Sequence, residues 1–236
     1  MQHDILVAES ARSKLQAGFQ VHRQSQREKG NFMPVIVIAN PKGGVGKSTF
    51  ATNLAGYFAA QGHKVMLGDV DAQQSSRSWL ALRPASLPAI QAWEIEDGHV
   101  AKPPKGTTHI VLDTPAGFSG KRFDKVMQIA DKVIVPLQPS IFDILATQEF
   151  LQKLKQAKGK FDLGVLGMRV NIRTRAADQL TQYVNGLGIP VLGFLRDTQN
   201  YVQLAANGAT LWDVAPSRVE KDLDQWQELL QWVEKK

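Results

Sequence analysis

The chain has 236 residues, of which 43% are hydrophobic and 21% are charged, so its composition is that of a folded globular protein. It contains no cysteine, which excludes disulfides, thiolate zinc sites, iron–sulfur clusters and cysteine nucleophiles. Its 28 lysines and arginines against 22 acids give a net charge of +6, which allows contact with a polyanion but does not require one.

The first 33 residues are polar and carry only a weak helical stripe of apolar residues. We expect residues 1–33 to form an N-terminal extension, mainly helical, that either packs on the domain or frays. No apolar run approaches the roughly 18 residues needed to cross a bilayer, and Met1–Ser10 lacks the basic flank and apolar core of a signal peptide. The sequence therefore predicts a cytoplasmic protein with a single domain over residues 34–236.

Apolar strands alternate with helical patterns throughout this domain. We expect strands at Val35–Asn40, Lys64–Gly68, Ile90–Ile95, His109–Leu112, Val133–Pro136, Leu163–Val170 and Pro190–Phe194. The helical patterns lie at Ser48–Gln61, at Ile144–Ala157 and in two closing helices, the last with a capping box at Ser217 and Glu220. This alternation predicts an α/β fold, a doubly wound and mostly parallel sheet with helices on both faces.

A glycine-rich segment from Asn40 to Thr49 joins the first strand to its helix, which is the setting of a phosphate-binding loop. The glycines let successive N–H groups surround phosphates, Lys47 can reach the β- and γ-phosphates, and the Ser48 hydroxyl can bind Mg²⁺. Pro41 stands where the common motif has a glycine, but the variant K-G-G-x-G-K-[ST] is complete and adds a second lysine. The predicted nucleotide-binding residues are Lys42, Gly43, Gly44, Val45, Gly46, Lys47, Ser48 and Thr49.

The variant loop resembles that of the deviant Walker A ATPases, the ParA/MinD family, which are P-loop NTPases of SIMIBI type. The resemblance implies MgATP as cofactor, catalytic roles for Lys42 and Lys47, and a homodimer in the ATP-bound state. In that family the lysine at the Lys42 position reaches the nucleotide of the partner subunit. A second cation beside the triphosphate would help to neutralise charge as the terminal phosphoryl group departs.

Acidic residues follow two of the predicted strands. The segment from Asp69 to Gln73 resembles the family's D-x-D-P-Q switch, with Ala72 in place of proline. The resemblance implies that Asp71 orients the attacking water and that Asp69 supports the Mg²⁺ shell; a helix cap is the alternative for Asp71. Asp113 ends a strand as a Walker B acid does, and would hold Mg²⁺ through a water. The predicted metal residues are therefore Ser48, Asp69 and Asp113, at strand ends that meet at one edge of a parallel sheet.

Two further segments resemble family positions. Asn171 follows a predicted strand and resembles the asparagine that reads adenine, with a simple turn or cap as the alternative. The segment Pro136–Ser140 resembles a loop near the family's dimer interface.

The surface that the ATP-bound dimer would bind separates two interpretations, DNA in ParA-like members and membrane in MinD-like members. A MinD-like tail needs a basic amphipathic helix, but the polar face of the last helix is acidic, so we expect it to pack on the sheet instead. For DNA, basic residues would contact phosphates rather than bases, and a solvated surface charge is the alternative for each of them. The candidates are Arg173, Arg175, Arg196, Arg218 and Lys221.

The resemblance extends over about residues 34–220 and implies a ParA-like ATPase that is slow until a partner stimulates it. Its dimer would bind non-specific DNA of the nucleoid and position a plasmid, chromosome or protein cargo. The activating partner would be a ParB-like or cargo-adaptor protein. The alternatives are a MinD-like, membrane-recruited regulator and, with less support because Lys42 would then have no evident function, a metabolic phosphotransferase.

Overall fold

The computed structural model describes residues 33–70, 74–93, 95–96, 99–100, 103–171, 173–186 and 188–235. The predicted N-terminal extension, except for Met33, lies outside the described residues, and so does Asp71.

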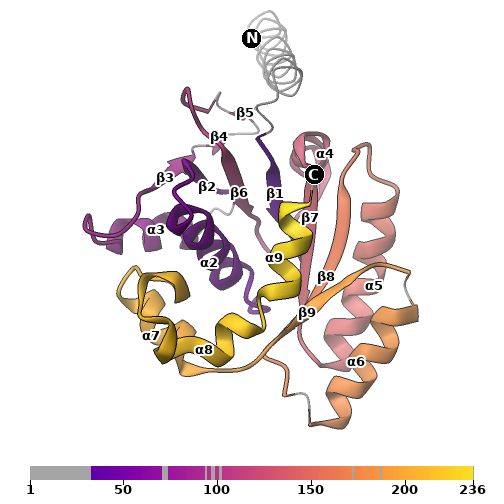
Figure 1. The fold of residues 1–236 in the computed structure, drawn as a ribbon. Coiled ribbons are helices and arrows are strands. Elements are labelled where there is room, and N and C mark those ends of the chain that lie inside the picture. The colour runs from indigo at the N-terminus through magenta and orange to yellow at the C-terminus, as the bar shows by residue number, and fades with distance from the viewer. Residues whose placement is uncertain are drawn as a thin grey trace, which may run out of the picture.

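A seven-stranded parallel sheet with the order β3-β2-β6-β1-β7-β8-β9 runs through the molecule (Figure 1). Its strands are β1 (Val35–Ile38), β2 (Val65–Asp69), β3 (Ile90–Trp93), β6 (His109–Asp113), β7 (Lys132–Leu137), β8 (Asp162–Met168) and β9 (Val191–Leu195). A separate antiparallel pair consists of β4 (Ile95–Glu96) and β5 (His99–Val100). The predicted parallel α/β fold is confirmed, although the strand expected at Ile90–Ile95 ends at Trp93.

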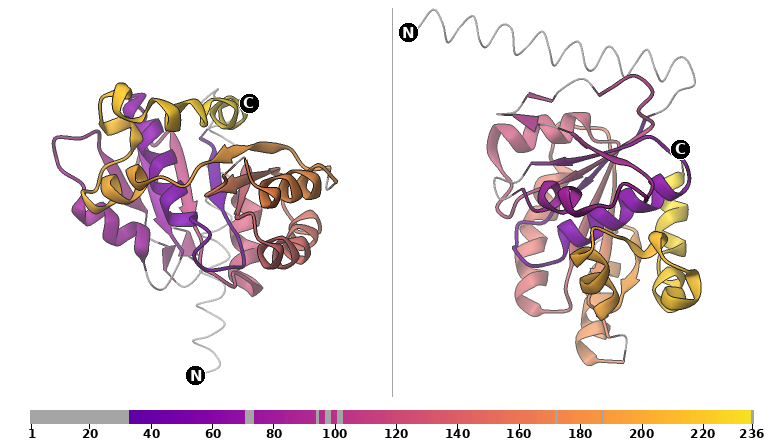
Figure 2. Two further views of the ribbon diagram at one scale, coloured as in Figure 1. Left: turned by 90° about the horizontal axis from the view of Figure 1, so that it is seen from below. Right: turned by 90° about the vertical axis from the view of Figure 1, so that its left-hand side faces the viewer.

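Helices cover both faces of the sheet (Figure 1, Figure 2). They are α2 (Lys47–Ala60), α3 (Ser75–Leu82), α4 (Gly120–Ile129), α5 (Ile141–Lys155), α6 (Arg175–Gly186), α7 (Gln199–Ala206), α8 (Pro216–Asp224) and α9 (Gln227–Glu234), with a 3₁₀ turn at Leu211–Asp213. Val35 and Val37 pack toward α4, α5 and α6, whereas Ile36 and Ile38 pack toward α2, α3 and the C-terminal helices. This alternation explains why β1 is apolar at every position. Among the described residues, no helix has the length and apolarity to span a membrane.

The C-terminal region differs from the expectation in one detail. Helix α8 begins at Pro216 and its N-cap residue, Ala215, makes no side-chain cap, so the capping box predicted at Ser217 and Glu220 is wrong. The fixed φ of proline already suits the first helical position, which moves the helix start ahead of the serine. Beyond α8, Trp226, Leu229 and Val233 are buried in the core, as expected for a helix that packs on the sheet.

Candidate nucleotide-binding site

The glycine-rich loop connects β1 to α2 at the carboxyl edge of the sheet. Gly44 and Gly46 have φ values of 76° and 95°, in the left-handed region that glycine occupies without strain. A Cβ atom at Gly46 would also lie 2.8 Å from Cε of Met168, at the end of β8, so a larger residue would have to displace the flexible end of that side chain. The loop thus ends on the N-terminus of α2, whose unpaired N–H groups favour an anion.

The two lysines of the loop occupy different places. Lys47 is 7% exposed, and its Nζ donates a hydrogen bond to the carbonyl oxygen of Lys42 at 2.7 Å, so it folds back over the loop. The Lys42 side chain is 35% exposed, and its Nζ lies 3.2 Å from Oδ2 of Asp143 on α5. Lys47 therefore belongs to the interior of its own loop, whereas Lys42 lies at the rim.

Side-chain hydrogen bonds that the sequence did not predict hold the loop in place. Asn40 is fully buried; its Oδ1 accepts from the backbone N–H of Lys42 at 2.8 Å. Its Nδ2 donates to the carbonyl oxygen of Pro136 at 2.7 Å and to Oγ1 of Thr147 at 3.2 Å. Gln138 donates from Nε2 to the carbonyl oxygen of Gly44 at 3.1 Å. The segment after β7 and helix α5 are thereby joined to the loop.

The acids of β2 and β6 lie side by side, because the register of the two strands pairs Asp69 with Asp113. Asp113 is 2% exposed, and burial raises its pKa to about 6, although hydrogen bonds from Ser48 and Ser76 oppose that rise. Oδ2 of Asp113 accepts from Oγ of Ser76 at 2.7 Å, whereas its buried Oδ1 has no hydrogen-bond partner in the described part of the chain. Such an oxygen, beside the Ser48 hydroxyl, fits Mg²⁺ with its bound waters.

Asp69 has a structural role in addition to the one predicted. Its Oδ2 accepts the backbone N–H groups of Ser76 and Arg77 at 2.8 and 3.2 Å, and so caps the start of α3. The support of a metal shell by Asp69 stays a prediction, as does the role of Asp71.

Asn171 lies after β8, the strand whose Met168 touches the glycine loop. Its Oδ1 accepts from the backbone N–H of Arg173 at 3.2 Å, which is the turn role considered as the alternative. Asn171 also borders a pocket of about 500 Å³, whose other lining residues are Val170, Arg173, Arg196, Asp197, Lys221 and Gln225. No lining residue of this pocket belongs to the phosphate loop, and the reading of adenine by Asn171 stays a prediction.

Residues 36–211 match the model of the CobQ/CobB/MinD/ParA nucleotide binding domain. The chain belongs to this family. Its members include the deviant Walker A ATPases of ParA and MinD type that the loop resembles, so the family expected from the sequence is confirmed.

Relatives of this ParA/MinD-family chain have been named for positioning and partition. The chain is 29% identical over 181 residues to "Maintenance of carboxysome distribution protein A" of Gloeobacter kilaueensis, covering 75% of this chain and 83% of that protein. It is 27% identical to "Chromosome-partitioning ATPase Soj" of Thermus thermophilus, over 61% of this chain and 73% of that protein. Among solved structures, the MinD cell division protein of Aquifex aeolicus matches with a TM-score of 0.67 at 20% identity. The match covers 85% of this chain and 96% of that one. That last likeness is one of fold.

The five basic residues expected on a DNA surface do not share one environment. Nε of Arg196 lies 2.5 Å from Oδ1 of the buried Asp222, so this guanidinium is held by an ion pair. Arg218 lines a separate pocket between α7 and α8. Exposed side chains without an ion pair to any described residue belong to Arg173, Arg175 and Lys221.

Proposed function

We propose that this protein is a ParA-like ATPase that forms an ATP-dependent homodimer, binds non-specific DNA in that state and is released by hydrolysis. The observation that carries the proposal is the placement of Lys42. Unlike Lys47, its side chain is 35% exposed at the rim of the loop, where a second subunit could be reached. A second lysine at this rim has a function if Lys42 of each subunit completes the nucleotide site of the other subunit.

The proposed reaction is hydrolysis of ATP by water to ADP and phosphate. The loop N–H groups and Lys47 would bind the phosphates, while Ser48 and Asp113 would hold Mg²⁺, which supplies charge neutralisation to the phosphoryl oxygens. Asp71 would orient the attacking water. Because the site relies on a positioned water and on charge rather than on a strong base, we expect slow turnover until a partner protein stimulates it.

The proposed DNA surface consists of Arg173, Arg175 and Lys221, which are exposed and have no ion pair within the described ranges. Basic side chains of this kind bind the phosphates of DNA and give no preference for a base sequence. A dimer doubles their number, and DNA affinity rises steeply with the number of phosphates neutralised. Dimerisation by ATP would then switch DNA binding on.

The names of the relatives suggest a spatial task for this cycle, since one is named for carboxysome distribution and another for chromosome partitioning. We propose that this chain likewise positions a plasmid, chromosome or protein assembly, and that it does so in the cytoplasm while bound to the DNA of the nucleoid. A ParB-like or cargo-adaptor protein would be its activator.

The experiment that tests the proposal measures retention of the full chain on non-specific DNA and on anionic liposomes, with ATP, ADP or no nucleotide, at two salt concentrations. Retention on DNA with ATP alone, weakened by salt, is the expected result. Retention on liposomes instead would favour a MinD-like regulator, although the buried face of Trp226, Leu229 and Val233 counts against a C-terminal membrane anchor. Retention on neither surface would contradict both.

A further inference from the structure

Ser76, the second residue of α3, is fully buried and binds both acids of the nucleotide site. Its Oγ donates a hydrogen bond to Oδ2 of Asp113 at 2.7 Å, and its backbone N–H donates to Oδ2 of Asp69 at 2.8 Å. The strands that carry these acids are neighbours in the sheet, with Asp69 paired to Asp113. One serine outside the motifs that predicted the site therefore connects the ends of β2 and β6.

The hydrogen bond from Ser76 determines which oxygen of Asp113 is available to a ligand. Rotation of an aspartate carboxylate about its Cβ–Cγ bond is only weakly restricted, so a donor is needed to fix it. Ser76 occupies Oδ2, whereas the buried Oδ1 has no hydrogen-bond partner among the residues that the structure describes. Oδ1 is thus the oxygen that is left for a water bound to Mg²⁺.

Asp113 also holds both ends of the segment that contains Asp71. The backbone N–H of Val70, directly before this segment, donates to the carbonyl oxygen of Asp113 at 2.9 Å. Ser76, directly after residues 71–75, donates to the Asp113 side chain. The residue proposed to orient the attacking water is therefore attached, through its two flanking residues, to the residue proposed to hold the metal.

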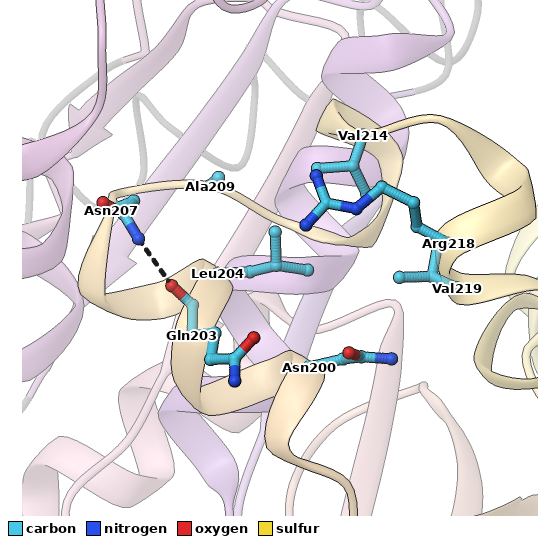
Figure 3. A pocket seen from close by; sticks show the side chains of 8 residues that line it. All are labelled: Asn200, Gln203, Leu204, Asn207, Ala209, Val214, Arg218 and Val219. Atoms are coloured by element: carbon cyan, nitrogen blue, oxygen red, sulfur yellow. Dashed lines mark hydrogen bonds between the residues drawn. The ribbon is translucent and has the colours of Figure 1, made fainter.

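The opposite end of α3 is fixed to the rest of the domain. Arg83, directly after α3, forms an ion pair with Asp213 at 2.9 Å, and the two side chains are 5% and 0% exposed. Arg83 also donates to the carbonyl oxygen of Gly208 at 3.1 Å, in the turn that follows Asn207 (Figure 3). Because α3 is anchored at both ends, the Ser76 hydroxyl is held in place before any ligand binds.

We propose that Ser76 is a positioning residue, which fixes the carboxylate of Asp113 for the Mg²⁺ of a bound nucleotide and attaches the Asp71 segment to that carboxylate. Ser76 acts through Asp113 and not by contact with the nucleotide. Loss of a hydrogen bond to a metal-site residue typically changes metal affinity by about ten- to hundredfold. The inference rests on the nucleotide site proposed above and adds a residue to it.

The test titrates Mg²⁺ into the full chain with a fluorescent ADP analogue, which binds without turnover. In the parent, Mg²⁺ should tighten binding of the analogue, and the midpoint of the titration reports metal affinity. Ser76→Ala should raise this midpoint by about tenfold, while affinity for the analogue in EDTA changes less than about twofold. A residue needed only for folding would change the affinity in EDTA as well, so that result would overturn the inference.

Two further variants complete the design. Ser78→Ala is the matched control, because Ser78 is exposed on the same helix and its loss should leave the midpoint unchanged. Asp113→Asn should raise the midpoint, and adding Ser76→Ala to it should change the midpoint less than about twofold more, since the serine acts through that carboxylate. Additive effects of the two substitutions would overturn the inference.

Failure of this inference can be told from failure of the proposed function. An unchanged midpoint in Ser76→Ala, with a clear Mg²⁺ effect in the parent, overturns the role of Ser76 and leaves the nucleotide site intact. If binding of the analogue to the parent does not respond to Mg²⁺, the proposed metal site is itself wrong, and the role of Ser76 is overturned with it.

Discussion

Lys42 and Asp143 form an ion pair within one subunit, with Nζ of the lysine 3.2 Å from Oδ2 of the carboxylate. Asp143 is the better buried of the two, since its side chain is 10% exposed against 35% for Lys42. It comes from the first turn of α5, beside the exposed apolar residues Ile141, Phe142 and Leu145. If Lys42 acts on the nucleotide of a second subunit, it must leave Asp143 first.

The Asp143→Asn variant should therefore form ATP-dependent dimers more readily than the parent. A partly exposed ion pair contributes about 0.2–1 kcal/mol, and two pairs would break in each dimer, so the dimerisation constant should rise roughly two- to thirtyfold. Sedimentation velocity at several protein concentrations with ATP measures this constant. Weaker dimers in the variant would show that Asp143 orients Lys42 for its task instead of restraining it.

Substitution of Lys42 itself separates the two lysines of the loop. Lys42→Gln should leave ATP binding by the monomer within about threefold of the parent, because Lys47 stays in place, yet prevent ATP-dependent dimers. Light scattering with and without ATP reports the dimer, and a fluorescent ATP analogue reports binding. ATP-dependent dimers of normal stability in this variant would refute the role of Lys42 across the interface.

Lys47→Ala should abolish nucleotide binding. The side chain is buried against its own loop, and loss of a charge-assisted contact to phosphate is expected to weaken ATP affinity by about a hundredfold or more. Isothermal titration with MgATP measures the affinity. The control is Lys64→Ala, which removes a lysine immediately before β2, at the opposite edge of the sheet, and should bind ATP normally. Undiminished affinity in Lys47→Ala would count against the assignment of the loop.

Asp71→Ala should trap an ATP-bound dimer, because the residue proposed to orient the attacking water is lost while the phosphate loop is intact. Phosphate release should fall, and the dimer should persist after free ATP is removed. Combining Asp71→Ala with Lys42→Gln provides the control, since this double variant should stay monomeric. Normal turnover in Asp71→Ala would assign the orientation of water to another residue.

A pH effect on stability is expected at the opposite edge of the sheet. Burial, aided by the neighbouring His63, lowers the pKa of His109 from 6.5 to about 4. Between these values the unfolded chain binds a proton that the folded one does not, so the free energy of unfolding should decrease as the pH falls from 6.5 toward 4. His109 thereby contributes about 3 kcal/mol to the free energy of unfolding. This contribution is present in full at pH values above the pKa of His109 in the unfolded chain.

His109→Phe should remove that part of the pH dependence while keeping a ring against Phe58, whose centroid lies 4.1 Å from that of His109. Urea unfolding of parent and variant at about pH 7 and about pH 4.5 isolates the contribution of His109, because the remaining titrating groups are common to both proteins. An identical loss of stability in the two proteins would show that His109 titrates normally in the folded state.

Much of the nucleotide site was predictable because its signals are local. The loop from Asn40 to Thr49 is one contiguous motif, and acids at the ends of parallel strands necessarily meet at one edge of the sheet. The register of β2 and β6 bears this out by pairing Asp69 with Asp113. The start of α8 was placed wrongly because proline and serine are both helix-start signals, and only the backbone shows which one applies.

The partners of the predicted residues could not be derived in the same way. Asp143 lies 101 residues from Lys42, and Ser76 lies 37 residues from Asp113. Their approach depends on the strand order, which brings β7 beside β1, and on the path of each connection. Arg196 and Arg218 look alike in the sequence, yet one is paired with Asp222 and the other is not.

The sequence by itself determined the family, the parallel sheet and the phosphate loop, because backbone conformation and strand burial follow from neighbouring residues. Only the tertiary structure decided where Lys42 is held, which acid caps α3 and which arginine is left without a carboxylate. Those relationships are side-chain contacts between elements far apart in the chain, and a contact of that kind exists only once the sheet has assembled in its particular order.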